Sequence, residues 1–138
     1  MMCVIRIRGE VGLNRDIVET LNRLRLRKKY SCVVFEPTEI KLGMLKKVKN
    51  FVAWGKLSDE ILEKLVESRG KLIDKAKKLK VKQIVEGIKS GKKYSDLNMK
   101  PFFRLHPPRG GIKSKIHFPK GVLGNHKEKI NELVERML

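Results

Sequence analysis

The first 57 residues contain three strand-like segments separated by two helix-like segments, and this alternation limits the folds open to the chain. The strand-like segments are residues 3–8, 31–36 and 51–55. In the first segment Cys3, Ile5 and Ile7 fall on one side, which predicts a strand with one buried face. Two helices between three strands can cover one face of a small sheet. The sequence therefore predicts an α+β fold with β-α-β-α-β order, a small open three-stranded sheet and both helices on one face.

Each of these two helices has a capping residue and an apolar stripe. The helices are expected to begin after Asn14 and after Thr38, whose side-chain oxygens can accept hydrogen bonds from the first turn. The first helix carries Ile17, Leu21 and Leu24 at helical spacing, and the second carries Ile40, Met44 and Val48.

Residues 58–138 differ in composition from the core at residues 1–57 and are predicted to form an extension of it. Helices are expected at about 58–69, 80–90 and 125–137, with Asn125 as the cap of the last one. Residues 98–124 are rich in lysine, arginine, proline and glycine and contain no acidic residue. This segment is predicted to be a basic loop.

The net charge restricts the class of partner. The chain has 138 residues and carries 33 Lys and Arg against 15 Asp and Glu, a formal net charge of +18. Such a charge repels itself unless an anionic surface neutralises it, and nucleic acid is the usual neutraliser. Cations are in excess in residues 1–58, 59–96 and 97–138 alike. This spread favours a protein embedded among several RNA segments over one with a single basic patch or tail.

Several other classes of protein are disfavoured. No helix with Trp, Phe and Leu on one face is found that could lie on a membrane, and no apolar run approaches the roughly 20 residues that span one. The two cysteines are too few for a disulfide framework, which fits a cytoplasmic location. The metal motifs HExxH and CxxC, the nucleotide phosphate loop and the hydrolase nucleophile elbow are absent. No enzyme activity, metal or other cofactor is predicted, with a ribonuclease using His and Lys as a minor alternative.

The segment Arg104–Lys113 is the strongest local indication of RNA contact. Pro107 and Pro108 hold the backbone extended, and Gly110 and Gly111 let it approach a phosphate closely. Arg109 can present two donors to a phosphate or a guanine edge. An ordinary basic surface loop is the alternative interpretation.

Other basic groups give weaker indications. Arg8 and Arg15 flank Gly9-x-x-Gly12, which could place a phosphate at a helix start or be a plain tight turn. A run of cations follows the first helix, where it could cap the helix or contact phosphate, and lysines on the second helix could be simply solvated. The candidate RNA-binding residues are Arg8, Arg15, Arg23, Arg25, Arg27, Lys28, Lys29, Lys46, Lys47, Lys49, Arg104, His106, Arg109, Gly110, Gly111, Lys113 and Lys115.

Several motifs together resemble the large-subunit ribosomal protein L-thirty family, in its long archaeal and eukaryotic form, which is numbered L-seven in eukaryotes. In the core these motifs are Ile7-Arg8-Gly9-x-x-Gly12, Gly43-Met44-Leu45-x-x-Val48 and Phe51-Val52-x-Trp54-Gly55. In the extension they are Pro101-Phe102-x-Arg104-Leu105, Pro107-Pro108-Arg109-Gly110-Gly111 and Gly124-Asn125-x-x-x-Lys129-Ile130-Asn131. Residues 71–97 carry no comparable motif.

The resemblance implies a non-catalytic protein that binds rRNA of the large ribosomal subunit, of the 23S type and near the 5S rRNA. It implies a truncated ferredoxin-like sheet with strand order 3-1-2, neighbouring ribosomal proteins as partners, and a monomer within a cytoplasmic ribosome of archaeal type. Arg8, Arg104 and Arg109 lie inside matched motifs and carry over most directly. The alternative is a general nucleic-acid-binding protein that anneals RNA or compacts DNA outside the ribosome.

Overall fold

The computed structural model describes residues 2–9, 14–36, 38–69, 81–90, 102–108, 121 and 123–137. The elements are β1 (Met2–Arg6), α1 (Arg15–Arg23), β2 (Ser31–Phe35), α2 (Glu39–Lys47), β3 (Val52–Lys56), α3 (Asp59–Arg69), α4 (Val81–Lys89), β4 (Phe103–Arg104), β5 (Gly124–Lys127) and α5 (Ile130–Met137). This order confirms the predicted α+β fold class and the β-α-β-α-β run at its start.

The strands form one sheet in the order β4-β2-β1-β3-β5. β1 is antiparallel to both β2 and β3, so the first three strands have the order 3-1-2 that the resemblance implies. The expected number of three strands is wrong, because the extension adds β4 antiparallel to β2 and β5 parallel to β3. Both edges of the three-stranded sheet would otherwise present unpaired N–H and C=O groups.

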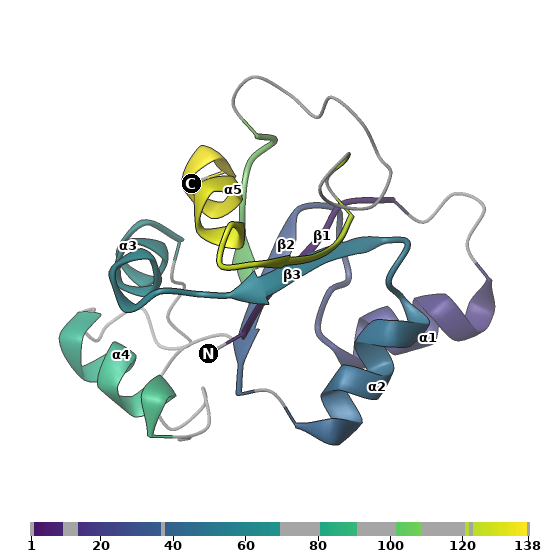
Figure 1. Cartoon of the computed structure of the whole chain (residues 1–138), viewed down its shortest axis with the longest axis horizontal. Coiled ribbons are helices and arrows are strands. Elements are labelled where there is room, and N and C mark those ends of the chain that lie inside the picture. Colours follow the sequence, from purple (N-terminus) through teal and green to yellow (C-terminus); the bar gives the residue numbers. More distant parts are fainter. Residues whose placement is uncertain are drawn as a thin grey trace, which may run out of the picture.

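Helices cover both faces of the sheet (Figure 1). α1 and α2 lie on one face, where Leu21 and Leu45 pack with Val4 of the central strand. α3, α4 and α5 lie on the opposite face, where Leu65 packs in a second cluster with Cys3. The two core helices therefore share one face as predicted, and the extension covers the other.

Strand β1 is buried on both faces, whereas its alternation predicted only one buried face. Cys3 and Ile5 belong to the cluster under α3–α5, Val4 belongs to the cluster under α1 and α2, and all three are fully buried. The prediction failed because a central strand with helices on both sides has no face toward solvent.

The capping prediction for α1 and α2 is confirmed, but the apolar stripe of α2 differs from the prediction. The side chains of Asn14 and Thr38 each accept a hydrogen bond from a main-chain N–H of the first turn. In α2 the buried residue is Leu45, and Val48 at its end is also buried, whereas Ile40 is 79% exposed. The helix therefore packs through its C-terminal half and leaves an apolar side chain outside.

The start of the last helix also differs from the prediction. Asn125 lies in β5, beside Trp54 of β3, and α5 begins only at Ile130. The Asn125 side-chain oxygen accepts a hydrogen bond from the Lys127 N–H two residues on, which stabilises a local turn and not a helix start. Likewise, β4 lies within the segment that was predicted to be entirely loop.

Two contacts fix the extension onto the core. The Asn131 side chain accepts a hydrogen bond from the Ser58 N–H at 2.8 Å and donates one to the Lys56 carbonyl at 3.4 Å, joining α5 to the end of β3. At Gly55 an added Cβ would collide with the Lys127 carbonyl oxygen and the Ile130 side chain. Only glycine fits where the end of β5 lies this close to β3.

Candidate nucleic-acid interface

The loop after α1 is held in a defined conformation that carries two arginines. α1 ends in a Schellman motif, in which the Leu26 N–H donates to the Leu21 carbonyl at 2.9 Å and the Arg25 N–H to the Asn22 carbonyl at 3.0 Å. Arg25 occupies the position where glycine is usual, with φ 66°. A left-handed backbone costs a residue with a side chain about 1–2 kcal/mol. The loop therefore holds Arg25 at a backbone cost that glycine would not incur.

Arg6 of β1 holds the same loop from within the protein. Its guanidinium is fully buried, with Nη1 donating to the Leu26 carbonyl at 2.8 Å and Nε donating to the Arg8 carbonyl at 2.9 Å. Its main-chain carbonyl accepts a hydrogen bond from the Tyr30 N–H at 2.7 Å. Because Leu26 lies between the two arginines of the loop, Arg6 fixes the backbone from which both extend.

Strand β4 brings residues from far along the chain to this loop. The Cα partner of Arg104 is Ser31, at the start of β2, and the Leu105 N–H donates to the Tyr30 carbonyl at 3.1 Å. Phe102 lies two residues before Arg104 on extended backbone, which places both side chains on one face. The guanidinium carbon of Arg104 is 5.9 Å from the centroid of the Phe102 ring.

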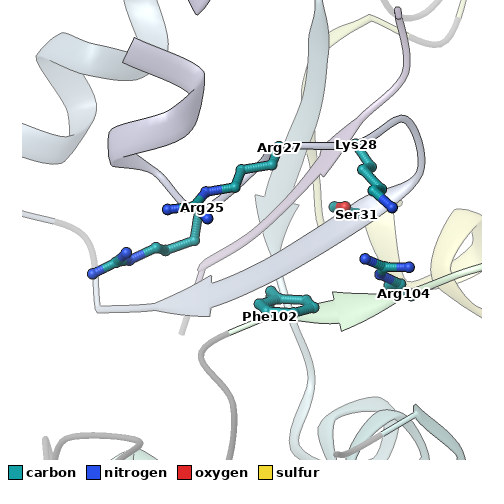
Figure 2. Close-up of a pocket in the computed structure, with 6 residues that line it drawn as sticks. All are labelled: Arg25, Arg27, Lys28, Ser31, Phe102 and Arg104. Atoms are coloured by element: carbon teal, nitrogen blue, oxygen red, sulfur yellow. The ribbon is translucent and has the colours of Figure 1, made fainter. Parts of the chain in front are cut away.

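These segments enclose a cationic cleft of about 390 Å³. Figure 2 shows its lining residues, which are Arg25, Arg27, Lys28, Ser31, Phe102 and Arg104. The four cations are exposed, and no acidic residue of the described part of the chain lines the cleft. Cations gathered in this way repel one another until an anion binds, and the donors of arginine match the oxygens of a phosphate. The predicted candidates Arg25, Arg27, Lys28 and Arg104 are therefore brought together.

The outer face of α2 is a second basic surface. Lys46 and Lys47 in its last turn and Lys49 just after it are exposed, as predicted from their places off the apolar stripe. Gly43 lies on the same exposed side, and a Cβ built there would have no atom within 4 Å. Together with the exposed Ile40, this face combines cations, a bare stretch of backbone and apolar surface.

Four other predicted cations lie outside the cleft. Arg8 and Arg15 are exposed, and the turn between them lies largely outside the described residues. Arg23 forms an ion pair with Glu19 at 2.7 Å on the surface of α1. The Lys29 ammonium lies 5.0 Å from the centroid of the neighbouring tyrosine ring. Their contact with RNA stays a prediction.

The predicted loop residues are only partly described. The His106 main-chain N–H donates to the Met137 carbonyl at 3.1 Å, which fixes the chain after β4 to the end of α5. The other predicted residues of this segment lie outside the described residues, namely Arg109, Gly110, Gly111, Lys113 and Lys115.

Three residues of the site are not among the candidates predicted from the sequence, namely Arg6, Phe102 and Ser31. The sequence predicts a strand at Arg6 but no role for its side chain, although a charged residue in an otherwise apolar strand is a usable indication of a buried hydrogen-bonding function. Phe102 and Arg104 have the i, i+2 spacing that places an aromatic ring and a cation on one side of a strand. Nothing in the sequence pairs Ser31 with Arg104, because that register depends on the tertiary fold.

Other chemistry finds little support in the described residues. They contain no group of three or more His, Cys, Asp or Glu side chains that could hold a metal ion. No helix among them has the length and hydrophobicity needed to cross a membrane. Cys3 and Cys32 are buried with their Sγ atoms 3.1 Å apart. Burial, together with the hydrogen bond to the neighbouring Cys3, raises the pKa of the Cys32 thiol and so favours its protonated form.

Comparison with known proteins places the chain among ribosomal proteins. Residues 2–52 match the family described as ribosomal protein L30p/L7e. The large ribosomal subunit protein uL30 of Archaeoglobus fulgidus is 46% identical, with 99% of this chain and 99% of the relative covered. The uL30 proteins of Ignicoccus hospitalis and Methanococcus maripaludis are 40% and 36% identical, each covering 98% of this chain and 96% and 97% of the relative.

A small basic α+β protein with this architecture and these archaeal relatives is of the structural ribosomal class and is not an enzyme. Within that class, the chain belongs to the ribosomal protein L30p/L7e family, whose archaeal members carry the name uL30. The family predicted from the sequence motifs is thereby confirmed.

Proposed function

We propose that this protein is a structural component of the large ribosomal subunit that binds and stabilises folded rRNA through phosphate and shape contacts. The single observation that carries the proposal is the cleft, where Arg25, Arg27 and Lys28 from one segment meet Arg104 from another. The names of its relatives give the subunit. The cleft and the outer face of α2 are separate basic surfaces, which supports contact with more than one RNA segment.

The partners follow from the same proposal. The RNA is of the 23S type, in the region of the 5S rRNA, and neighbouring ribosomal proteins contact the remaining surface of a single copy in the cytoplasmic ribosome. Phosphates are the ligands that the exposed guanidinium and ammonium groups fit. Each such contact releases condensed counterions, so binding weakens as salt rises.

Sedimentation tests the subunit assignment. The full chain, labelled and expressed in an archaeal host, is expected to co-sediment with the large subunit at one copy per particle in moderate salt. The double variant Arg27→Ala/Lys28→Ala is expected to be depleted from that peak. The matched control Lys64→Ala/Lys89→Ala removes two charges from exposed ion pairs away from the cleft and is expected to stay bound. A wild-type chain spread over total RNA and DNA would contradict the proposal and support a general nucleic-acid-binding protein.

A further inference from the structure

We propose that the cleft receives one unpaired nucleotide of the RNA, with its base stacked on Phe102 and its phosphates held by the surrounding cations. The inference rests on the proposed function and specifies the ligand of its main site. A phosphate alone would need only the cations. The aromatic ring among them is the feature that points to a base.

The position of the Phe102 ring suits it to stack with a base. It is half-buried and packs against the cluster under α1 and α2, while it also lines the cleft. Its packing against that cluster and the pairing of the following strand to β2 restrict its movement before any ligand arrives. A fixed ring beside cations is the arrangement on which single-stranded bases stack. Bases within a paired A-form helix are not available for such stacking, whereas unpaired ones are.

The size and lining of the cleft fit a nucleotide. Its volume of about 390 Å³ lies in the range typical of sites for small organic ligands. In Figure 2, Arg25 and Arg27 lie to one side of Phe102 and Lys28 and Arg104 to the other, which matches the phosphates on the two sides of one nucleotide. Ser31 is only 4% exposed, and its side chain lines the wall, where the hydroxyl can hydrogen-bond a base edge or a 2′-OH.

Arg104 must exchange its partner when the base enters. In the free protein its guanidinium lies over the Phe102 ring, and a cation–π contact at an exposed site is worth about a two- to fivefold change in an equilibrium. Stacking of a base on an aromatic side chain changes the binding affinity by about five- to 150-fold. The exchange therefore favours the base on the ring, and it frees Arg104 to bind the adjacent phosphate.

Photocrosslinking tests the inference. The full chain is bound to an in vitro transcript of archaeal large-subunit rRNA, irradiated with short-wavelength ultraviolet light, and digested for mass spectrometry. The expected result is a nucleotide adduct on the peptide that contains Phe102. This experiment uses the wild-type chain, so a folding defect cannot obscure it, and an adduct pattern that spares this peptide would overturn the inference.

Affinity measurements supply the second arm. Phe102→Leu keeps apolar bulk but removes the ring, and it is expected to weaken rRNA binding about five- to 150-fold with an unchanged dependence on salt, because the charge of the protein stays the same. Phe102→Trp, which keeps an aromatic ring, is expected to bind rRNA as tightly as the wild type does. The control Phe51→Leu makes the same change in a half-buried residue of the same cluster that does not line the cleft.

The outcomes separate the two proposals. If Phe102→Leu binds as tightly as the wild type while Arg27→Ala/Lys28→Ala binds poorly, the nucleotide site is wrong and the rRNA-binding function stands. If the wild type does not prefer the rRNA transcript to an unrelated RNA of equal length, the proposed function itself fails.

Discussion

Replacing Arg25 with glycine is expected to make the protein more stable and a poorer RNA binder at the same time. Arg25 follows the last turn of α1 with φ 66°, where a side chain costs about 1–2 kcal/mol and glycine costs nothing sterically. Glycine loses about 0.5–1 kcal/mol of this gain through the greater freedom of its unfolded chain. The net gain in the free energy of unfolding is about 0.5–1 kcal/mol, which corresponds to a rise of about 3 °C in Tm for a chain of this length.

The same change removes a guanidinium from the cleft. Without the phosphate that Arg25 neutralises, the slope of log K against log salt becomes shallower by about 0.7–0.9, and the affinity for rRNA falls. Thermal unfolding followed by circular dichroism measures the first effect, and filter binding of the rRNA transcript at several salt concentrations measures the second.

Arg25→Ala is the matched control, because alanine also lacks the charge but keeps the cost of the left-handed backbone. Arg25→Ala is therefore expected to share the binding defect of Arg25→Gly without its gain in stability. Equal stability of these two variants would refute the backbone argument. Wild-type affinity in both would refute a phosphate contact at Arg25.

Three further predictions concern the glycines, the buried arginine and the thiols. Gly43→Ala is expected to raise the free energy of unfolding by about 1 kcal/mol, because the site is helical and open. Gly55→Ala is expected to lower the free energy of unfolding by about 3 kcal/mol, because the added Cβ collides with β5. Urea denaturation measures both changes. Arg6→Met is expected to cost about 2 kcal/mol and to weaken rRNA binding with no change in the salt slope, because Arg6 positions the loop and does not touch phosphate. Cys3 and Cys32 are expected to resist iodoacetamide at pH 8 until urea unfolds the chain, because both thiols are buried and burial raises the pKa of Cys32. Rapid labelling of the native protein would contradict this burial.

The helices and strands of the core could be predicted from the sequence because each depends on residues close together in the chain. The three strands, the caps at Asn14 and Thr38 and the helices at residues 59–69 and 81–89 follow from periodicity and capping chemistry. β4 could not be predicted, because two residues carry no periodicity and pair only where β2 leaves an edge open. The position of Asn125 could not be predicted either. Its side-chain oxygen does accept a main-chain hydrogen bond, but it does so in a turn beside β3 and not at the start of a helix.

The sequence predicts which cations belong to the site but not that they lie together in one cleft. The sequence predicts RNA contact for all four cations, Arg25, Arg27, Lys28 and Arg104. It also predicts a loop for the segment that contains Arg104, and nothing in it joins that loop to the run after α1. Only the pairing of Ser31 with Arg104 joins them into one cleft. The burial of Arg6 was missed for a related reason, since its partners are carbonyls of a loop that pattern arguments do not place.

If the protein functions as proposed, rRNA occupies the cleft between the loop after α1 and β4. The most direct test is a cryo-electron microscopy structure of the large ribosomal subunit that contains this chain. We expect rRNA phosphates about 3 Å from the guanidiniums of Arg25 and Arg104 and an unpaired base on the Phe102 ring. A cleft that faces solvent or another protein in that structure would contradict this expectation.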